Sequence, residues 1–95
     1  MKKLTPASLK TALKDLPQWK AAQGGKAIAR KFKFKDFNEA FAFMTRAALL
    51  AAQMDHHPEW FNVYNKLEVT LSTHDAGGVT QNDIKMAKAM DGFAR

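Results

Sequence analysis

The stretch RKFKFKDFNEAFAFMTRAALLAAQM, residues 30–54, changes its hydrophobic period from two to nearly four, and this change decides the fold. In its first part, lysines alternate with phenylalanines over residues 31–34, which is typical of a strand with one buried face and one solvated face. Asp36 then stands at a helix N-cap, and Glu39 follows at the capping-box position. The stretch therefore predicts a strand that leads directly into a long helix.

The helix predicted after Asp36 has two apolar stripes instead of one. The first consists of Ala40, Phe43, Ala47, Leu50 and Met54, and the second consists of Phe37, Phe41, Met44, Ala48 and Ala51. A single stripe is enough to dock a helix on a sheet. The second stripe needs another cover, and in a chain of 95 residues the simplest cover is the same helix of another subunit. We therefore expect a homodimer or homotetramer.

The N-terminal part predicts a helix and a hairpin. Thr5 can cap a helix whose first residue is Pro6, its leucines recur with helical spacing, and Pro17 ends it. Residues 19–23 and 26–34 are predicted to form two antiparallel strands around a glycine turn at residues 24–25.

The C-terminal part repeats this order. Residues 60–64 and 67–73 are predicted as two strands joined by a tight turn at Asn65 and Lys66. Thr80 opens the last helix, with Asp83 completing a capping box. The whole chain is thus expected to be one α+β domain, residues 1–95, with a four-stranded antiparallel sheet, three helices on one face, and the order α-β-β-α-β-β-α.

The composition narrows the chemistry and the compartment. The chain has no cysteine, which excludes disulfides, thiolate nucleophiles and zinc-thiolate sites. No apolar run of signal-peptide length follows the basic N-terminus, and the most apolar window, residues 40–52, is short and contains Thr45 and Arg46. We expect a cytoplasmic protein without a membrane partner.

The net charge of +6 raises the question of a nucleic-acid partner. The basic residues are densest in residues 30–35, at Arg30, Lys31, Lys33 and Lys35. Such a surface attracts polyanions, but lysine alternating with phenylalanine is also the pattern of a half-solvated strand. The sequence favours the strand interpretation over direct nucleic-acid binding.

The three histidines are the strongest candidates for chemistry. His56 and His57 stand together in DHHPEW, residues 55–60, and His74 is the third. With a turn at residues 65–66, counting along the two strands places His57 opposite His74. Imidazoles have an unperturbed pKa of about 6.5, so a cluster of them can supply both a proton donor and a proton acceptor near neutral pH. The sequence predicts one acid/base site.

Two other interpretations of the histidines stay open at this point. His56 and His57 could simply end a helix, where a positive ring interacts well with the helix dipole, and His74 could lie on a solvated strand end. A metal site with three histidine ligands is less favoured, because adjacent histidines rarely direct both rings to one ion and no carboxylate spacing accompanies them.

Residues near the histidines are assigned by strand parity and capping. Trp60 and Tyr64 are predicted to face the core, and Phe61 to face the pocket, where its ring could stack on a flat ligand. Trp19 fits either the core or the pocket. Asp83 is a capping residue first, although it could also orient the site.

These motifs resemble those of the pterin-4a-carbinolamine dehydratases, which are also dimerization cofactors of a homeodomain transcription factor. The resemblance rests on DHHPEWFNVYNK, on TLSTHDAGGVTQND and on the helix before them. It implies dehydration of 4a-hydroxytetrahydropterin to quinonoid dihydropterin, without metal or organic cofactor, which recycles the pterin spent by aromatic amino acid hydroxylases. It also implies an antiparallel sheet with helices on one side, in dimers or tetramers.

The resemblance also implies roles for individual residues. His56 and His74 are the candidates for protonating the 4a-hydroxyl, and His57 is assigned to binding or to proton removal. The expected substrate contacts are Pro58, Phe61, Trp19 and Asp83. The chain departs from the family at Ala52, four residues before His56, where relatives often carry an acidic or polar side chain that could orient a histidine.

A second class of function follows from the same resemblance. Some relatives stabilise dimers of a transcription factor through the helix that otherwise builds the tetramer, so residues 37–54 could serve a protein partner instead of a catalytic role. Neither the pterin side chain that is accepted nor the choice between dimer and tetramer follows from the sequence.

Overall fold

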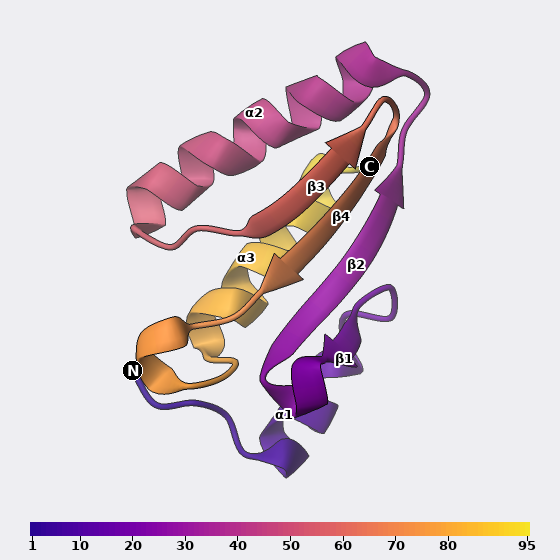
Figure 1. Ribbon diagram of the computed structural model, residues 1–95. Helices are drawn as coiled ribbons and strands as arrows, with labels where there is room; N and C mark the ends of the chain where they lie inside the picture. Colours follow the sequence, from indigo (N-terminus) through magenta and orange to yellow (C-terminus); the bar gives the residue numbers. More distant parts are fainter.

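The computed structural model describes residues 1–95 as a four-stranded antiparallel sheet with helices on one face (Figure 1). The elements are α1 (Pro6–Leu13), β1 (Lys20–Ala22), β2 (Ala27–Lys33), α2 (Phe37–Met54), β3 (Glu59–Val63), β4 (Lys66–Leu71) and α3 (Gln81–Phe93), with short 3-10 helices at Gln23–Gly25 (η1) and His74–Ala76 (η2). This confirms the predicted α+β class and element order.

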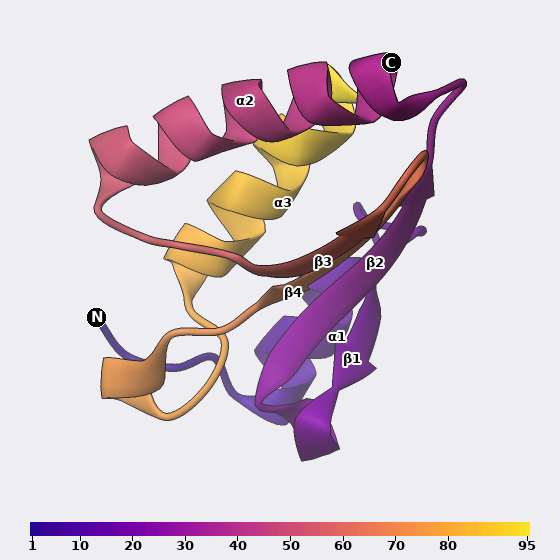
Figure 2. The same cartoon turned by 45° about the horizontal axis from the view of Figure 1, so that its top comes forward.

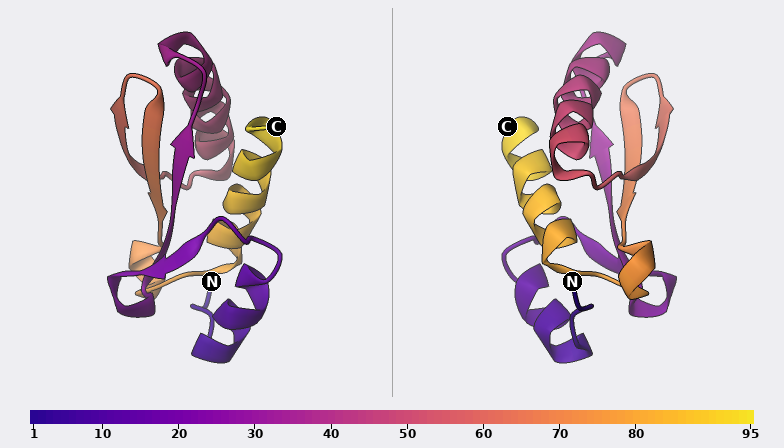
Figure 3. Two further views of the ribbon diagram at one scale, coloured as in Figure 1. Left: turned by 90° about the vertical axis from the view of Figure 1, so that its right-hand side faces the viewer. Right: turned by 90° about the vertical axis from the view of Figure 1, so that its left-hand side faces the viewer.

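The strands are arranged in the order β1-β2-β4-β3, so that β4 lies in the middle of the sheet and β3 at one edge. In the view of Figure 2, α2 crosses above the sheet and α3 lies below α2. The two side views of Figure 3 place α1, α2 and α3 on the same side of the strands. The opposite face of the sheet has no helix over it. None of the helices is long and apolar enough to span a bilayer.

The three helices begin at the predicted N-cap residues. Thr5 accepts the N–H of Ser8, Asp36 accepts that of Glu39, and Thr80 and Asp83 form the expected capping box at α3. The core lies between the sheet and the helices, and its largest fully buried side chains include Trp19, Leu16, Ile28, Leu67, Leu71, Met86 and Met90. Burial of this apolar surface is the main force that holds the helices on the sheet.

The turn between β3 and β4 differs from the prediction. Val63 pairs with Lys66, so the two turn residues are Tyr64 and Asn65, and the register is shifted by two residues from the predicted one. The reason is a set of side-chain bonds: the Asn65 amide donates to the Phe34 carbonyl at 3.0 Å, and the Asn62 amide donates to the Lys66 carbonyl at 2.8 Å. These bonds fix the turn one residue earlier.

The shifted turn overturns two expectations. Tyr64 takes a left-handed conformation with φ 53° and is 61% exposed, so the prediction that it belongs to the core is wrong. His57 does not lie opposite His74, because β4 ends at Leu71 and the chain then turns into η2. A shift of two residues preserves the faces, which is why Trp60 still faces the core, paired with Val69.

Candidate active site

His56 is held at the point where α2 gives way to β3. The helix ends at Asp55, whose φ of 49° is left-handed, and the His56 N–H donates to the Ala51 carbonyl at 3.1 Å. The sharp turn directs the His56 ring inward, and only 9% of the residue is exposed. The next residue, His57, remains on the surface.

Asp83 is the buried centre of a hydrogen-bond network that reaches His56. The residue is 0% exposed, and its Oδ1 lies 2.5 Å from His56 Nε2. Its Oδ2 accepts from the Thr73 hydroxyl and from the Thr80 N–H, both at 2.8 Å. Each carboxylate oxygen therefore has a partner, as a buried carboxylate requires.

This network determines the tautomer of His56. A carboxylate can only accept hydrogen bonds, so with Asp83 as the carboxylate the proton between the two side chains is assigned to His56 Nε2. The other ring nitrogen, Nδ1, has no partner within the chain and is the atom that His56 can offer to a ligand. In many sites a carboxylate or carbonyl oxygen accepts the N–H of one imidazole nitrogen and so sets the orientation of the ring.

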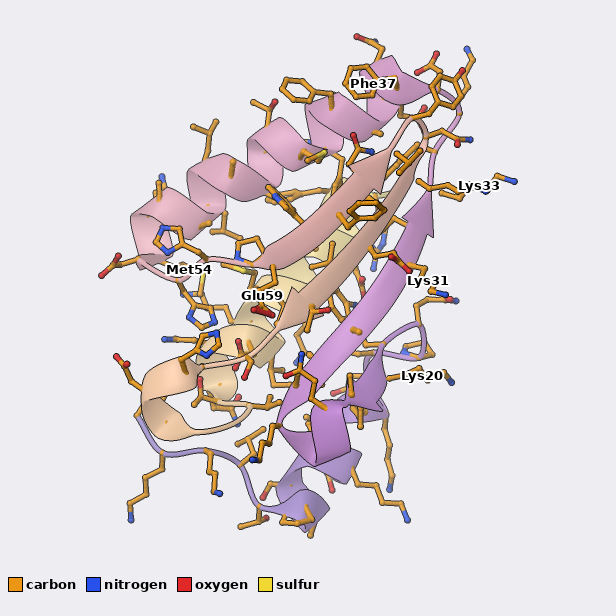
Figure 4. All side chains as sticks on the ribbon, in the orientation of Figure 1. Lys20, Lys31, Lys33, Phe37, Met54 and Glu59 are labelled. Carbon is orange, nitrogen blue, oxygen red and sulfur yellow. The ribbon has the colours of Figure 1, made fainter.

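His74 is tied to the same region from another direction. It is the first residue of η2, and its Nε2 lies 3.8 Å from Glu59 Oε1 at the start of β3 (Figure 4 labels Glu59). Thr73, directly before it, donates to Asp83. The His74 side chain is 81% exposed, so this ion pair is loose and open to solvent.

The structure thus brings the two ends of the predicted site to one place, where β3 begins, β4 ends and α3 starts. His56 and His74 are connected through Asp83 and Thr73, and His57 and Pro58 lie on the short segment between His56 and Glu59. No group of three or more histidine and acidic side chains is arranged to hold a metal ion. The arrangement can supply proton donors and acceptors at the edge of a buried carboxylate.

Two of the predicted substrate contacts, Trp19 and Phe61, lie outside the hydrogen-bond network of His56 and Asp83. Trp19 is 2% exposed in the core, and its indole N–H donates to Asp91 Oδ1 at 2.8 Å, which leaves no ring surface for a ligand. Phe61 is 64% exposed on the open face of the sheet and lines a hollow there with lysines. The residue lies two positions after Glu59 and points to the same face.

Sequence reasoning missed Thr73 and Glu59. Both contact site residues directly, but no spacing rule connects a threonine before a histidine with a carboxylate ten residues later. The departure at Ala52 has a simple structural counterpart: Ala52 is exposed on the last turn of α2, while the carboxylate that orients His56 comes from Asp83.

The comparisons with known proteins show which family the chain belongs to. The sequence model of the family described as "Pterin 4 alpha carbinolamine dehydratase" matches residues 2–93. The chain belongs to the pterin-4a-carbinolamine dehydratase family. The predicted family is therefore confirmed.

Individual relatives of this family are close in length and sequence. The chain is 59% identical to a protein of Burkholderia orbicola (strain MC0-3) over 97% of this chain and 90% of the relative, and 60% identical to one of Rhodopseudomonas palustris (strain BisB18) over 99% and 93%. Both carry the name pterin-4-alpha-carbinolamine dehydratase provisionally.

Two solved structures share the fold. A crystal structure of a "transcriptional coactivator/pterin dehydratase" from Brucella melitensis superposes with a TM-score of 0.96 at 52% identity, over 99% of this chain and 100% of the other. A pterin dehydratase-like protein described as a RuBisCO assembly factor in the alpha-carboxysome has a TM-score of 0.71 at 18% identity, over 81% and 89% of the chains, and shows the fold alone.

Proposed function

We propose that the protein dehydrates a 4a-hydroxytetrahydropterin to the quinonoid dihydropterin by acid/base catalysis at His56, His57 and His74. The observation that carries the proposal is the buried Asp83 that holds His56 by Nε2 and leaves Nδ1 free. Such an arrangement suits a histidine that exchanges a proton with a ligand, and membership of the dehydratase family gives the ligand class.

The reaction requires two proton transfers and no change of redox state. A proton is delivered to the 4a-hydroxyl as the C4a–O bond breaks, so that the oxygen leaves as water. A second proton leaves N5 of the ring, and the N5 lone pair forms the new double bond to C4a. Neither step calls for a metal or an organic cofactor, because imidazoles can supply both the acid and the base.

We assign the roles from the position of each ring. His56 and His74 are proposed to protonate the hydroxyl. His56 does so as the doubly protonated ring, which donates from Nδ1 while its Nε2–H stays on Asp83. His57, exposed beside them, is proposed to bind the pterin or to accept the N5 proton. Pro58 is proposed to contact the substrate. Its fixed φ is also proposed to set the direction of the chain between His57 and the start of β3.

A double variant, His57→Ala with His74→Ala, tests the catalytic assignment. Both side chains are on the surface, so the variant is expected to fold, while the rate of dehydration should fall about 100-fold to 10,000-fold for lack of acid/base groups. The measurement is the decay of 4a-hydroxytetrahydropterin with each purified protein, followed by absorbance.

Lys10→Ala, an exposed change on α1, is the matched control for this test. Wild-type protein that is folded and yet does not accelerate the decay would refute the dehydratase proposal. Equal acceleration by the wild type and the double variant would remove the chemistry from these two histidines.

The proposed activity implies one reaction that supplies the 4a-hydroxy substrate and another that consumes the quinonoid product. The quinonoid product must be reduced before the pterin can be used again, and the 4a-hydroxy substrate is the product of aromatic amino acid hydroxylation. We propose that the protein recycles the pterin of such a hydroxylase.

We further propose that the exposed side of α2 forms a homo-oligomer, a dimer or a tetramer. Phe43 and Ala47 of the first stripe are buried. Of the second stripe, Ala51 is buried as well, whereas Phe37 and Phe41 are 47% and 54% exposed. Figure 4 shows Phe37 on the side of α2 that faces away from the sheet. A row of exposed apolar side chains on one helix is typical of an interface.

Phe41→Asp tests this interface. The change places a charge in the centre of the exposed row, so the protein is expected to sediment as a smaller species at a loading concentration where the wild type is oligomeric. Asn38→Asp, which adds the same charge at an exposed position of the same helix, should leave the assembly intact. Identical sedimentation of the wild type and Phe41→Asp would show that the row is not the interface.

The alternative function is a protein-binding module that acts on a transcription factor through the same helix. It is favoured by the exposed row of α2 and by the Brucella neighbour that is described as a transcriptional coactivator. The double histidine variant separates the two functions, because a partner bound by α2 would still bind when dehydration is lost.

A further inference from the structure

The face of the sheet opposite the helices is open and carries a row of lysines. Lys31 and Lys33 project from β2, with Lys20 of β1 near one end of the row and Lys66 of β4 at the other. Figure 4 labels Lys20, Lys31 and Lys33, which project along one margin of the sheet. Residues two apart on a strand are about 6.6 Å apart and neighbouring strands about 4.8 Å, so the lysines form a closely spaced line.

This line is poorly neutralised. Lys33 and Lys66 are directly opposite each other in the register, an arrangement of like charges that destabilises a sheet. Two acids share this face. Glu68 lies 3.6 Å from Lys31 with both side chains largely in water. Glu59, opposite Thr70 at the far end of β3, lies 3.8 Å from His74. Two hollows of about 370 and 500 Å³ cover this face, and Glu68 is the acidic residue that lines them.

An exposed aromatic ring lies beside the lysines. Phe61 of β3 is 64% exposed and Val63 is 56% exposed, and both line the smaller hollow together with Lys31, Lys33 and Lys66. Phe61 is paired with Glu68, one strand away from Lys31. The hollow that Phe61 lines contains these lysines and none of the three histidines, so its exposed ring is available to a ligand of this face.

We propose that this face binds single-stranded nucleic acid, with the lysine row on the phosphates and Phe61 stacked on a base. A polyanion would relieve the repulsion between Lys33 and Lys66, and a flat apolar ring matches the face of an unpaired base. An acidic protein would satisfy the charge but leaves the exposed ring without a specific partner. The surface lies on the side of the sheet opposite α2, so an oligomer built on α2 leaves it free.

The structure also changes which residues carry the charge. Arg30 faces the core side, where its guanidinium binds Asp91 and stacks on Phe32 with Cζ 4.0 Å from the ring centroid. Lys35 lies beyond the end of β2. Lys20 and Lys66, which are distant in sequence, take their places on this face.

The test is fluorescence anisotropy of the full-length protein with a labelled ten-nucleotide RNA or DNA strand, and with the same sequence as a duplex. We expect the single strands to bind more tightly than the duplex, with a slope of log K against log salt of about −3 for four lysine contacts. Lys33→Ala with Lys66→Ala should halve this slope, and Phe61→Ala should weaken binding about tenfold without changing it.

Matched controls and contrary outcomes make the test decisive. Lys10→Ala with Lys14→Ala removes the same charge from α1 and its C-cap and should leave the affinity nearly unchanged. Dehydratase activity of the Lys33/Lys66 variant should equal that of the wild type. Equal affinity for duplex and single strand, or for heparin, combined with no effect of Phe61→Ala, would overturn the proposal and reduce the surface to non-specific charge. Absence of binding at low salt would overturn it as well.

Discussion

Asp83→Asn is expected to reduce dehydration by about 1,000-fold to 10,000-fold, the scale seen when an asparagine replaces the carboxylate that orients a catalytic histidine. The amide must keep its oxygen toward the Thr80 N–H and the Thr73 hydroxyl, so its NH₂ group faces His56. His56 then has to accept at Nε2 and carry its proton on Nδ1. In this tautomer Nδ1 already carries a proton and cannot accept another. The doubly protonated ring also has no carboxylate to accept its Nε2–H, so His56 is impaired both as a base and as an acid.

The effect on folding should be much smaller than the effect on rate. Two of the three hydrogen bonds of Asp83 survive in the asparagine variant, so we expect the free energy of unfolding to fall by about 1–3 kcal/mol. Rates are measured with protein shown to be folded, and the tautomer of His56 is read from the ¹⁵N chemical shifts of its ring. Both readouts are needed. If Asp83 had only a structural role, Asp83→Asn would lower the free energy of unfolding without moving the proton of His56.

Asp75→Asn is the matched control, since Asp75 is an exposed acid of η2. It should leave rate and tautomer unchanged. Wild-type activity of Asp83→Asn, or a His56 that keeps its proton on Nε2 in that variant, would show that the carboxylate does not orient a catalytic ring.

Asp91→Ala is expected to have the largest effect on stability. Asp91 Oδ1 accepts from both the Trp19 indole at 2.8 Å and the Arg30 guanidinium at 2.5 Å, and the Arg30 side chain is 19% exposed. Removal of the carboxylate leaves two donors, one of them charged, without this acceptor, and we expect a loss of about 2–4 kcal/mol. For a domain of this size, that lowers the melting temperature by about 10–20 °C, which calorimetry can measure.

The same variant tests whether Trp19 belongs to the site. Because Trp19 is buried in the core and its partly buried partner Asp91 is bonded to it and to Arg30, Asp91→Ala should retain the wild-type dehydration rate per folded molecule at a temperature well below its transition. Asp15→Ala, which removes an exposed acid 4.0 Å from Lys88, is expected to change the melting temperature little. If the folded Asp91→Ala variant loses the dehydration rate, Trp19 is a substrate-binding residue after all.

The sequence alone determined the elements and the family. Period-two and period-four patterns, the caps at Thr5, Asp36 and Thr80, and the glycine turn at residues 24–25 are local signals, and each predicts its element because the physics that forms it acts within a few residues. The histidines were also visible as candidates, because their chemistry is a property of the side chain.

Tertiary structure decided how the site is joined together. Asp83 was predicted as a helix cap, and only the packing of α3 against α2 brings its other oxygen to His56, which follows the end of α2. Thr73 and Glu59 carry no signal in the sequence, since each gains its role from a partner on another element. The β3–β4 register was missed for the same reason: the bond from Asn65 to Phe34 crosses 31 residues and selects a turn that local preference did not.

The open face of the sheet shows the same division. The alternation of lysine and phenylalanine in β2 predicted a solvated face, but the register alone places Lys66 opposite Lys33 and Phe61 beside them. Charges that are far apart along the chain meet because strand pairing is a long-range interaction. Sequence periodicity therefore determines which face a side chain takes, while only the assembled sheet determines what it meets there.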